Sequence, residues 1–251
     1  MLVAQRAKCL KCDRRPYQIA TDEGLLSTKA IIIAAGAEYR RLPVEGLSRF
    51  EGAGVYYSAT HLEAQYCGGE KVVVVGGGNA AGQAAIFLSE TARMVYLVVR
   101  SSSLESSMSR YLIQRIENSS KIELLTDTEI SKLDGNDRLE RVEWRNNKTG
   151  ETKAQDVQHL FSMIGAIPNS QWLEKCLILD KRDFVKTGPD LSDQELKAWN
   201  WPLKRGPLLL ETSLPGVFAV GDIRSGSVKR VASAVGEGSI AISLVHRVLA
   251  E

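Results

Sequence analysis

The chain has 251 residues, of which 44% are hydrophobic and 25% are charged, which is typical of one large globular domain or two modest ones. Its 32 basic and 30 acidic residues leave a formal charge of +2, which excludes a general polycationic surface for nucleic acid or acidic membranes. The apolar runs are far shorter than the roughly 18–20 residues that span a bilayer, and the first residues do not form a signal peptide. We therefore expect a cytoplasmic protein that binds neither nucleic acid nor membrane.

The cysteine content indicates thiols rather than a disulfide scaffold. Four cysteines are too few for such a scaffold, and structural disulfides are not expected in the cytoplasm. Cys9 and Cys12 have the CxxC spacing of a zinc half-site or a redox pair. No second CxxC or histidine pair completes a metal site, and the segment is typical of a strand that enters a turn. We interpret each cysteine as a buried thiol and predict no metal site.

The beginning of the chain predicts strands separated by turns. Residues 3–10 and 17–21 are expected strands on either side of a turn. Residues 30–34 form an unbroken apolar run, which is typical of a strand buried on both faces. This strand is expected to end at a turn that contains Ala35 and Gly36.

A strand, a glycine turn, a helix and a second strand over residues 72–100 form the most informative unit. Four valines are followed by Gly-Gly-Gly-Asn-Ala-Ala, which fits the GxGxxA dinucleotide-binding fingerprint. Gly76 allows the tight turn, Gly78 lets the backbone approach a pyrophosphate, and Ala81 keeps the helix at 80–90 close to the strand. The helix N-terminus supplies amide donors and a positive dipole to the phosphates. The predicted contacts in this loop are Gly76, Gly77, Gly78, Asn79 and Ala80.

The end of the second strand, at 94–100, indicates which nucleotide binds. A NAD site usually has an acidic residue there, whereas a 2′-phosphate is bound by a cation and small donors. Here Arg100 can fork onto a phosphate and Ser101 can donate a hydrogen bond, with Arg110 as a second cation. The alternative is a solvated arginine at a strand end. We predict NADPH rather than NADH.

Strands return after this unit. Residues 139–145 and 152–157 alternate around an Asn/Gly turn and predict a hairpin. Residues 160–166 form another buried strand, which contains Gly165 near its end. The likeness of this strand end to residues 33–37 suggests two domains built on one plan.

The last informative segment, residues 212–222, is a short apolar strand that ends in Gly221 and Asp222. Open α/β sheets bind ligands at the carboxyl ends of their strands. Gly221 allows a close approach, and the Asp222 carboxylate can accept hydrogen bonds from polyol hydroxyls. A helix at 229–239 follows, and its positive end can face an electron-rich ring carbonyl. A Gly-Asp pair is also a common turn when taken alone.

Together these motifs resemble the thioredoxin reductase-like branch of the two-domain pyridine nucleotide-disulfide oxidoreductases. The resemblance is carried by residues 72–82, 164–169, 212–222 and 230–238, which occur in the family's order. The run from Gly221 onward is most similar to the reductase module often found beside a cyclic-nucleotide-binding domain in bacterial proteins.

The resemblance implies an α/β, Rossmann-like, three-layer fold in which an NADPH domain is inserted into an FAD domain. The expected FAD domain comprises residues 1–54 and 168–251, and the expected NADPH domain comprises residues 55–167. It also implies a cytoplasmic homodimer with FAD and NADPH as cofactors, in which hydride passes from NADPH to FAD. The implied flavin-side contacts are Ala35, Gly36, Gly221, Asp222, Arg230, Val231 and Ala232, and Gly165 is a further implied cofactor contact.

Two departures from the family pattern change these expectations. The family's redox Cys-x-x-Cys is replaced by residues 57–61, Tyr-Ser-Ala-Thr-His, and Cys67 is a single cysteine nearby. A dithiol exchange requires a partner thiol, so reduction of thioredoxin by the usual route is not expected. In addition, no GxGxxG loop for FAD precedes residue 30. We therefore expect a fragment, or a chain that another chain completes, and such a chain need not be active alone.

Two other functions stay open at this point. A ferredoxin-NADP reductase-like electron transferase is favoured by the missing cysteine pair, with a small protein or small molecule as the unknown electron acceptor. A non-catalytic module would bind NADPH without flavin. No catalytic residue is predicted for any of these functions.

Overall fold

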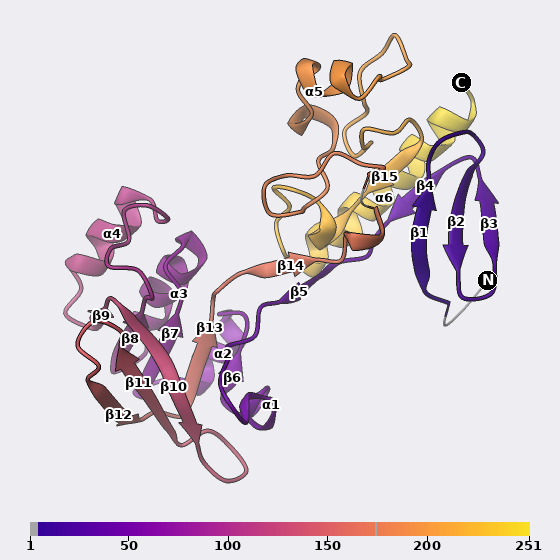
Figure 1. Cartoon of the computed structure of the whole chain (residues 1–251). Helices are drawn as coiled ribbons and strands as arrows, with labels where there is room; N and C mark the ends of the chain where they lie inside the picture. Colours follow the sequence, from indigo (N-terminus) through magenta and orange to yellow (C-terminus); the bar gives the residue numbers. More distant parts are fainter. Residues whose placement is uncertain (1–4, 174) are drawn as a thin grey trace. The chain divides into compact units, whose positions relative to one another are not determined.

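The computed structural model describes residues 5–173 and 175–251, so residues 3 and 4 of the first expected strand lie outside it. The chain folds into two compact units. Unit 1 comprises the described residues of Met1–Glu38 and Ala166–Glu251, and unit 2 comprises Tyr39–Gly165. The chain passes between them along the paired strands β5 (Ala37–Tyr39) and β14 (Ala166–Pro168) (Figure 1).

Residues 39–54 belong to unit 2 because apolar side chains of this segment pack in its core. Leu47 and Phe50, from the short helix α1 (Leu47–Phe50), are buried there together with Leu42. The predicted domains, residues 1–54 with 168–251 for FAD and 55–167 for NADPH, stay a prediction.

Unit 2 is built on a five-stranded parallel sheet with the strand order β6-β13-β7-β8-β9. The α/β, Rossmann-like fold expected from the sequence is confirmed by this sheet and its helices. The strands are β6 (Val55–Tyr56), β13 (His159–Ser162), β7 (Lys71–Val75), β8 (Met94–Val98) and β9 (Ile122–Leu125).

The continuous valine run of β7 is explained by layers on both faces of the sheet. Val72 and Val74 pack against a helical layer, whereas Val73 and Val75 pack against a second, antiparallel sheet. Successive residues of a strand point to opposite faces, so a strand covered on both sides must be apolar throughout. The helices are α2 (His61–Tyr66), α3 (Asn79–Ser89) and α4 (Arg110–Glu117), and the second sheet comprises β10 (Thr128–Asp134), β11 (Arg141–Asn146) and β12 (Thr152–Asp156).

Unit 1 contains a three-stranded antiparallel sheet and a two-stranded parallel sheet (Figure 1). In the parallel pair, Val217 and Ala219 of β15 face one apolar core, whereas Phe218 faces a second core beneath the last helix. The first sheet comprises β1 (Ala7–Lys11), β2 (Tyr17–Thr21) and β3 (Leu25–Thr28), and the second comprises β4 (Ile31–Ile33) and β15 (Val217–Ala219).

The remaining elements of unit 1 are helices. They are the 3-10 helices η1 (Gln171–Leu173), η2 (Gly188–Asp190) and η3 (Gly221–Ile223), and the α-helices α5 (Asp193–Ala198) and α6 (Val231–Leu249). The prediction of a helix over residues 229–239 was wrong at its end, because α6 begins at Val231 and continues to Leu249. Leu244, Val245 and Val248 of this extension pack against the core that contains Phe218.

The interpretation of every cysteine as a buried thiol was wrong. Cys12, which follows β1, forms a disulfide with Cys176, which follows η1. Cys9 is an exposed thiol, and only Cys67 is both free and buried. This pairing could not be predicted from composition, because it depends on two segments that lie 164 residues apart and meet only in the folded chain. Among the described residues, no helix is both long enough and apolar enough to cross a membrane.

One buried carboxylate holds the C-terminal part of unit 1 together. Glu211 is fully buried and accepts hydrogen bonds from Arg205 Nη1 at 2.6 Å, from the Leu208 amide at 2.9 Å and from the Gly216 amide at 2.8 Å. A buried charge with several donors is stabilising only while all the partners are present. Arg205 also contacts Glu251, whose side chain is 40% exposed.

We expect Glu211→Ala to lower the free energy of unfolding by about 3–5 kcal/mol, because it leaves the Arg205 charge and two amides without their acceptor. Glu251→Ala is the matched control, since it removes an exposed carboxylate from the same arginine and should cost about 0–1 kcal/mol. Urea unfolding followed by circular dichroism measures both. Equal costs for the two variants would contradict the role given to Glu211.

Candidate nucleotide-binding sites

The glycine turn of unit 2 begins directly after β7 and depends on Gly76. Its φ angle is +141°, and its amide donates to the Val98 carbonyl of β8 at 3.0 Å. A Cβ at this position would lie 2.6 Å from the Met163 carbonyl oxygen and 3.1 Å from the Ala81 side chain. Only glycine allows both this backbone conformation and this close approach. The tasks that the sequence assigned to Gly76 and Ala81 are therefore met by contacts.

The space beside Gly78 is open. Gly78 is the N-cap of α3 and has an extended backbone, and a Cβ there would meet nothing nearer than the Ser107 carbonyl at 3.9 Å. As a glycine it supplies no side-chain cap to the first-turn amides of α3. Free space next to uncapped helix amides fits a pyrophosphate. The loop that contains Gly76, Gly77, Gly78, Asn79 and Ala80 thus fits a dinucleotide.

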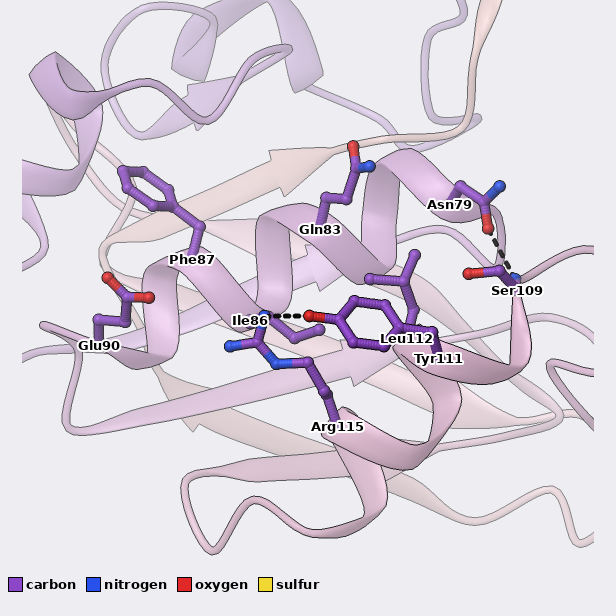
Figure 2. A pocket seen from close by; sticks show the side chains of 9 residues that line it. All are labelled: Asn79, Gln83, Ile86, Phe87, Glu90, Ser109, Tyr111, Leu112 and Arg115. Atoms are coloured by element: carbon purple, nitrogen blue, oxygen red, sulfur yellow. Dashed lines mark hydrogen bonds between the residues drawn. The ribbon is translucent and has the colours of Figure 1, made fainter.

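The loop after β8 folds over this turn. Ser107 Oγ donates to the Gly77 carbonyl at 2.8 Å. The Ser109 amide donates to Asn79 Oδ1 at 2.7 Å, and Figure 2 shows this bond. A Cβ at Gly77 would lie 3.9 Å from Ser101 Oγ. The structure therefore brings the start of this loop, where the exposed Arg100 lies, next to the glycine turn at residues 76–78. Sequence reasoning did not single out Ser107 and Ser109, whose roles depend on the fold of the loop.

A recess of about 310 Å³ adjoins the turn on the side of α3 and α4 (Figure 2). Asn79 lines it at the start of α3, while Gln83 and Phe87 continue along the same helix. On α4, Arg115 donates to the Tyr111 hydroxyl at 3.3 Å. The recess is thus a mixed polar and aromatic groove, and Asn79 belongs both to its lining and to the glycine loop after β7.

Residues 57–61, where the resemblance places the redox cysteines, form structural contacts. Thr60 caps α2 in a capping box with Glu63, whose carboxylate accepts from the Thr60 amide at 2.8 Å. The Tyr57 hydroxyl donates to Glu51 at 2.5 Å, and burial together with this carboxylate raises the pKa of Tyr57 to about 12. His61 packs edge-on against the Phe87 ring. None of these groups can carry out a dithiol exchange.

Cys67 is inert in its environment. It is fully buried, and its Sγ donates to the Glu63 carbonyl at 3.2 Å. Burial, reinforced by the charges of Glu63 and Glu70, raises the pKa of Cys67 to about 12. A thiol that stays protonated is neither a nucleophile nor a redox partner at neutral pH.

In unit 1, two further turns follow the ends of adjacent parallel strands. Ile31 of β4 pairs with Val217 of β15, and the Val220 amide donates to the Ile33 carbonyl at 3.0 Å. Both strands therefore end at the same edge, where Ala35 and Gly36 follow one strand and Gly221 and Asp222 follow the other. Gly36 and Gly221 have φ angles of +68° and +69°. This is the edge at which open α/β sheets bind ligands.

The N-terminus of α6 closes over the Gly221 turn. A Cβ at Gly221 would lie 3.2 Å from the Ala234 Cβ, which places Arg230, the N-cap of α6, and the following Val231 and Ala232 near this edge. The Lys229 ammonium donates to the Asp222 carbonyl at 3.1 Å, and burial lowers the pKa of Lys229.

Glu237 holds the same turn and was missed from the sequence. It accepts from the Gly221 amide at 2.7 Å and from Arg224 Nη2 at 2.6 Å. Burial opposes ionisation of Glu237, but the hydrogen bonds from Arg224 and Gly221 outweigh it and lower its pKa. The Gly-Glu-Gly sequence around it gave no signal for a partner in another element.

A cavity of about 580 Å³ lies beside Ala35 in unit 1. Its volume is in the range of ligand-binding sites, which fits part of a flavin nucleotide. Its lining is mixed, with the Trp172 indole, the cations of Arg6 and Lys8, and the Glu38 carboxylate, and Lys8 is paired with Asp22 at 2.7 Å. The lining residues are Arg6, Ala7, Lys8, Ala35, Glu38, Asn169, Gln171 and Trp172.

The predicted flavin-side contacts lie in unit 1, whereas the further predicted cofactor contact, Gly165, does not. Gly165 belongs to unit 2, where it has a φ angle of +97° and its carbonyl accepts from the Arg40 amide at 3.0 Å. The individual cofactor contacts stay predictions.

Comparison with known proteins gives a consistent match. Residues 3–238 match the family described as pyridine nucleotide-disulphide oxidoreductase. The thioredoxin reductase of Debaryomyces hansenii is 31% identical over 255 residues, which cover 96% of this chain and 71% of that protein. The thioredoxin reductase of Mycolicibacterium smegmatis is 32% identical over 223 residues, which cover 89% of this chain and 65% of that protein.

Solved structures agree with these matches. Thioredoxin reductase from Giardia duodenalis has a TM-score of 0.82 at 29% identity, with 100% of this chain and 76% of that chain covered. The enzyme from Streptococcus pyogenes has a TM-score of 0.78 at 26% identity, with 98% and 73% covered. This chain therefore spans about two thirds to three quarters of the length of the relatives it matches.

We expect Gly78→Ala to fold normally but to weaken NADPH binding about tenfold or more, because a methyl group would enter the space left for the pyrophosphate. Gly68→Ala is the matched control, since its Cβ also meets nothing nearer than 3.9 Å and its φ is also not positive. Calorimetric titration and thermal unfolding test the pair. Equal NADPH affinities for the two variants would remove Gly78 from the site.

We expect Cys67 to resist alkylation by iodoacetamide at pH 8, because its raised pKa and burial suppress the thiolate. The exposed Cys9 is the internal control and should be alkylated under the same conditions. Mass spectrometry of the native and the urea-unfolded protein gives the modified fraction at each site. Rapid native modification of Cys67 would contradict its inert environment.

Proposed function

The chain belongs to the pyridine nucleotide-disulphide oxidoreductase family, and we propose that it takes part in electron transfer from NADPH through FAD to an acceptor other than a thioredoxin disulfide. The family prediction made from the sequence is confirmed, and the thioredoxin reductase relatives are FAD-dependent NAD(P)H oxidoreductases. Because the chain spans only part of these relatives, the complete activity is a proposal.

A single observation carries this proposal. Each unit has a glycine turn at the carboxyl ends of parallel strands, Gly76 after β7 in unit 2 and Gly221 after β15 in unit 1. Two such edges suit two nucleotides, one in each unit. FAD, when bound, accepts a hydride from NADPH and passes electrons on. The loop at Gly78 would bind the NADPH phosphates, and the Asp222 carboxylate would accept hydrogen bonds from the ribitol hydroxyls of FAD. Glu237 holds the Gly221 turn in place through the Gly221 amide.

The acceptor is proposed from the chemistry of the replaced segment. Tyr57 and Thr60 are engaged in hydrogen bonds and Cys67 is a protonated buried thiol, so this segment supplies no dithiol. This observation favours the ferredoxin-NADP reductase-like alternative, in which electrons leave the flavin for a small protein or small molecule. The homodimer implied by the resemblance is part of the same proposal.

The experiment measures flavin binding and acceptor choice in the chain as it exists. The protein is mixed with FAD, and the quenching of flavin fluorescence gives the affinity. NADPH oxidation is then followed with a quinone, with ferredoxin, and with thioredoxin. We expect flavin binding and turnover with quinone or ferredoxin only. NADPH binding without any flavin binding would favour the non-catalytic module, and turnover with thioredoxin would overturn the proposed acceptor class.

We expect Arg100→Ala to weaken NADPH binding about 10- to 100-fold and to leave NADH binding nearly unchanged, because a charge-assisted bond to the 2′-phosphate is worth about 1.5–3 kcal/mol. Arg93→Ala is the control, since Arg93 is also an exposed cation but precedes β8, whereas Arg100 follows it. Titration of each variant with both nucleotides gives the ratios. Equal losses for NADPH and NADH would overturn the NADP preference.

A further inference from the structure

The disulfide between Cys12 and Cys176 is not used by the proposed nucleotide chemistry. It joins the residue after β1 to the segment after η1, and these two elements pack through Leu10 and Leu173 in one buried core. Cys176 is 5% exposed, whereas Cys12 is only half-buried. Cys12 is therefore the more exposed residue of the pair.

The two elements that the disulfide joins are also two walls of the cavity beside Ala35. Ala7 and Lys8 of β1 line one side, and Gln171 and Trp172 of η1 line another. The bond lies just beyond the end of each element. Breaking it would release the covalent restraint between these walls.

Hydrogen bonds lead from η1 to the turn that follows β4. The Trp172 indole donates to the Asn169 carbonyl at 3.1 Å. The Asn169 amide in turn donates to the Gly36 carbonyl at 3.1 Å, and its side-chain Nδ2 donates to the Ala35 carbonyl at 2.9 Å. The Ala35–Gly36 turn is therefore held by a residue that is itself held by η1.

We propose that the Cys12–Cys176 bond is a thiol–disulfide exchange site for a dithiol, and that its oxidised state holds the cavity and the Ala35–Gly36 turn in the form that binds FAD. The FAD part of this inference rests on the proposed function. The disulfide has two discrete states, and a two-state element is what couples a chemical change to a distant site.

The exchange balances without any further reactant. A thiolate of the dithiol attacks Cys12 Sγ, a mixed disulfide forms, and the Cys12–Cys176 bond breaks with its electron pair on Cys176 Sγ, which takes up a proton. The second thiol of the reductant then displaces Cys12, which is also protonated. Two electrons and two protons pass to the protein, and the reductant leaves as its own disulfide. Lys11 precedes Cys12, and Asp13, Arg14 and Arg15 follow it, so the local sequence is net positive and favours the approach of an attacking thiolate.

The test compares oxidised and dithiothreitol-reduced protein with two readouts. Hydrogen exchange of peptides covering residues 35–37 and 169–172 reports on the turn without any cofactor. Quenching of flavin fluorescence reports on FAD affinity. We expect reduction to speed exchange in both peptides and to weaken FAD binding about fivefold or more, the lower end of usual coupling between sites.

Variants separate this effect from general reduction. The double variant Cys12→Ser/Cys176→Ser should behave as reduced protein under both conditions, whereas Cys9→Ser, which removes the exposed thiol of β1, should respond as the unmodified chain does. If the double variant does not fold, the reduced and reoxidised unmodified chain supplies the same comparison.

The outcomes distinguish a failure of the disulfide proposal from a failure of the proposed function. A bond that dithiothreitol opens only in denaturant overturns the thiol–disulfide exchange site. Hydrogen exchange that is the same in the oxidised and the fully reduced protein overturns the coupling of the bond to the Ala35–Gly36 turn. If reduction speeds hydrogen exchange but leaves the FAD affinity unchanged, the coupling of the bond to the flavin site is overturned. If reduction speeds hydrogen exchange but FAD binds to neither the oxidised nor the reduced protein, the thiol–disulfide exchange site is supported and the proposed function is contradicted.

Discussion

Burial of the parallel strands β7 and β15 on both faces is the constraint on which both candidate sites depend. In β7, alternate valines pack against the helical layer and against the antiparallel sheet, while β13 and β8 occupy its two edges. Such a strand has no exposed face or edge, so polar chemistry is confined to its end. Gly76 begins the turn at that end in unit 2, and Gly221 does the same in unit 1. The position of each site is thus a consequence of core packing.

The two sites are assembled in different ways. In unit 2 the glycine turn and the loop that covers it come from one continuous stretch, residues 76–109, with Met163 as the close backbone neighbour. In unit 1 the Ala35–Gly36 turn is held by Asn169, which lies 134 residues from Ala35, and the Gly221 turn is held by Glu237, which lies 16 residues away on α6. The geometry of unit 1 therefore depends on long-range contacts, of which the Cys12–Cys176 bond is the covalent one.

This difference explains how much of the molecule could be predicted from the sequence. The valine run and the glycines after it predict a strand, a turn and a nucleotide site, because the pattern and its cause are local. The end of α6 was misjudged, since Gly236 and Gly238 weaken the helical pattern while packing against Phe218 sustains the helix. Glu237 and the disulfide were missed because partners in other elements define them, and no local pattern records such partners.

The insertion of unit 2 also determines the order in which the chain can fold during synthesis. Unit 2 is continuous from Tyr39 to Gly165, so all its strands are available before β15 has been made. Domains generally fold as units as the chain emerges. Meanwhile β4 awaits its parallel partner, and the apolar segment Ile31–Ile33 has an unpaired edge of the kind that promotes aggregation. Because β4 and β15 are far apart in the sequence, the parallel pair that aligns the two turns forms late. The segment Ile31–Ile33 is exposed to aggregation until then.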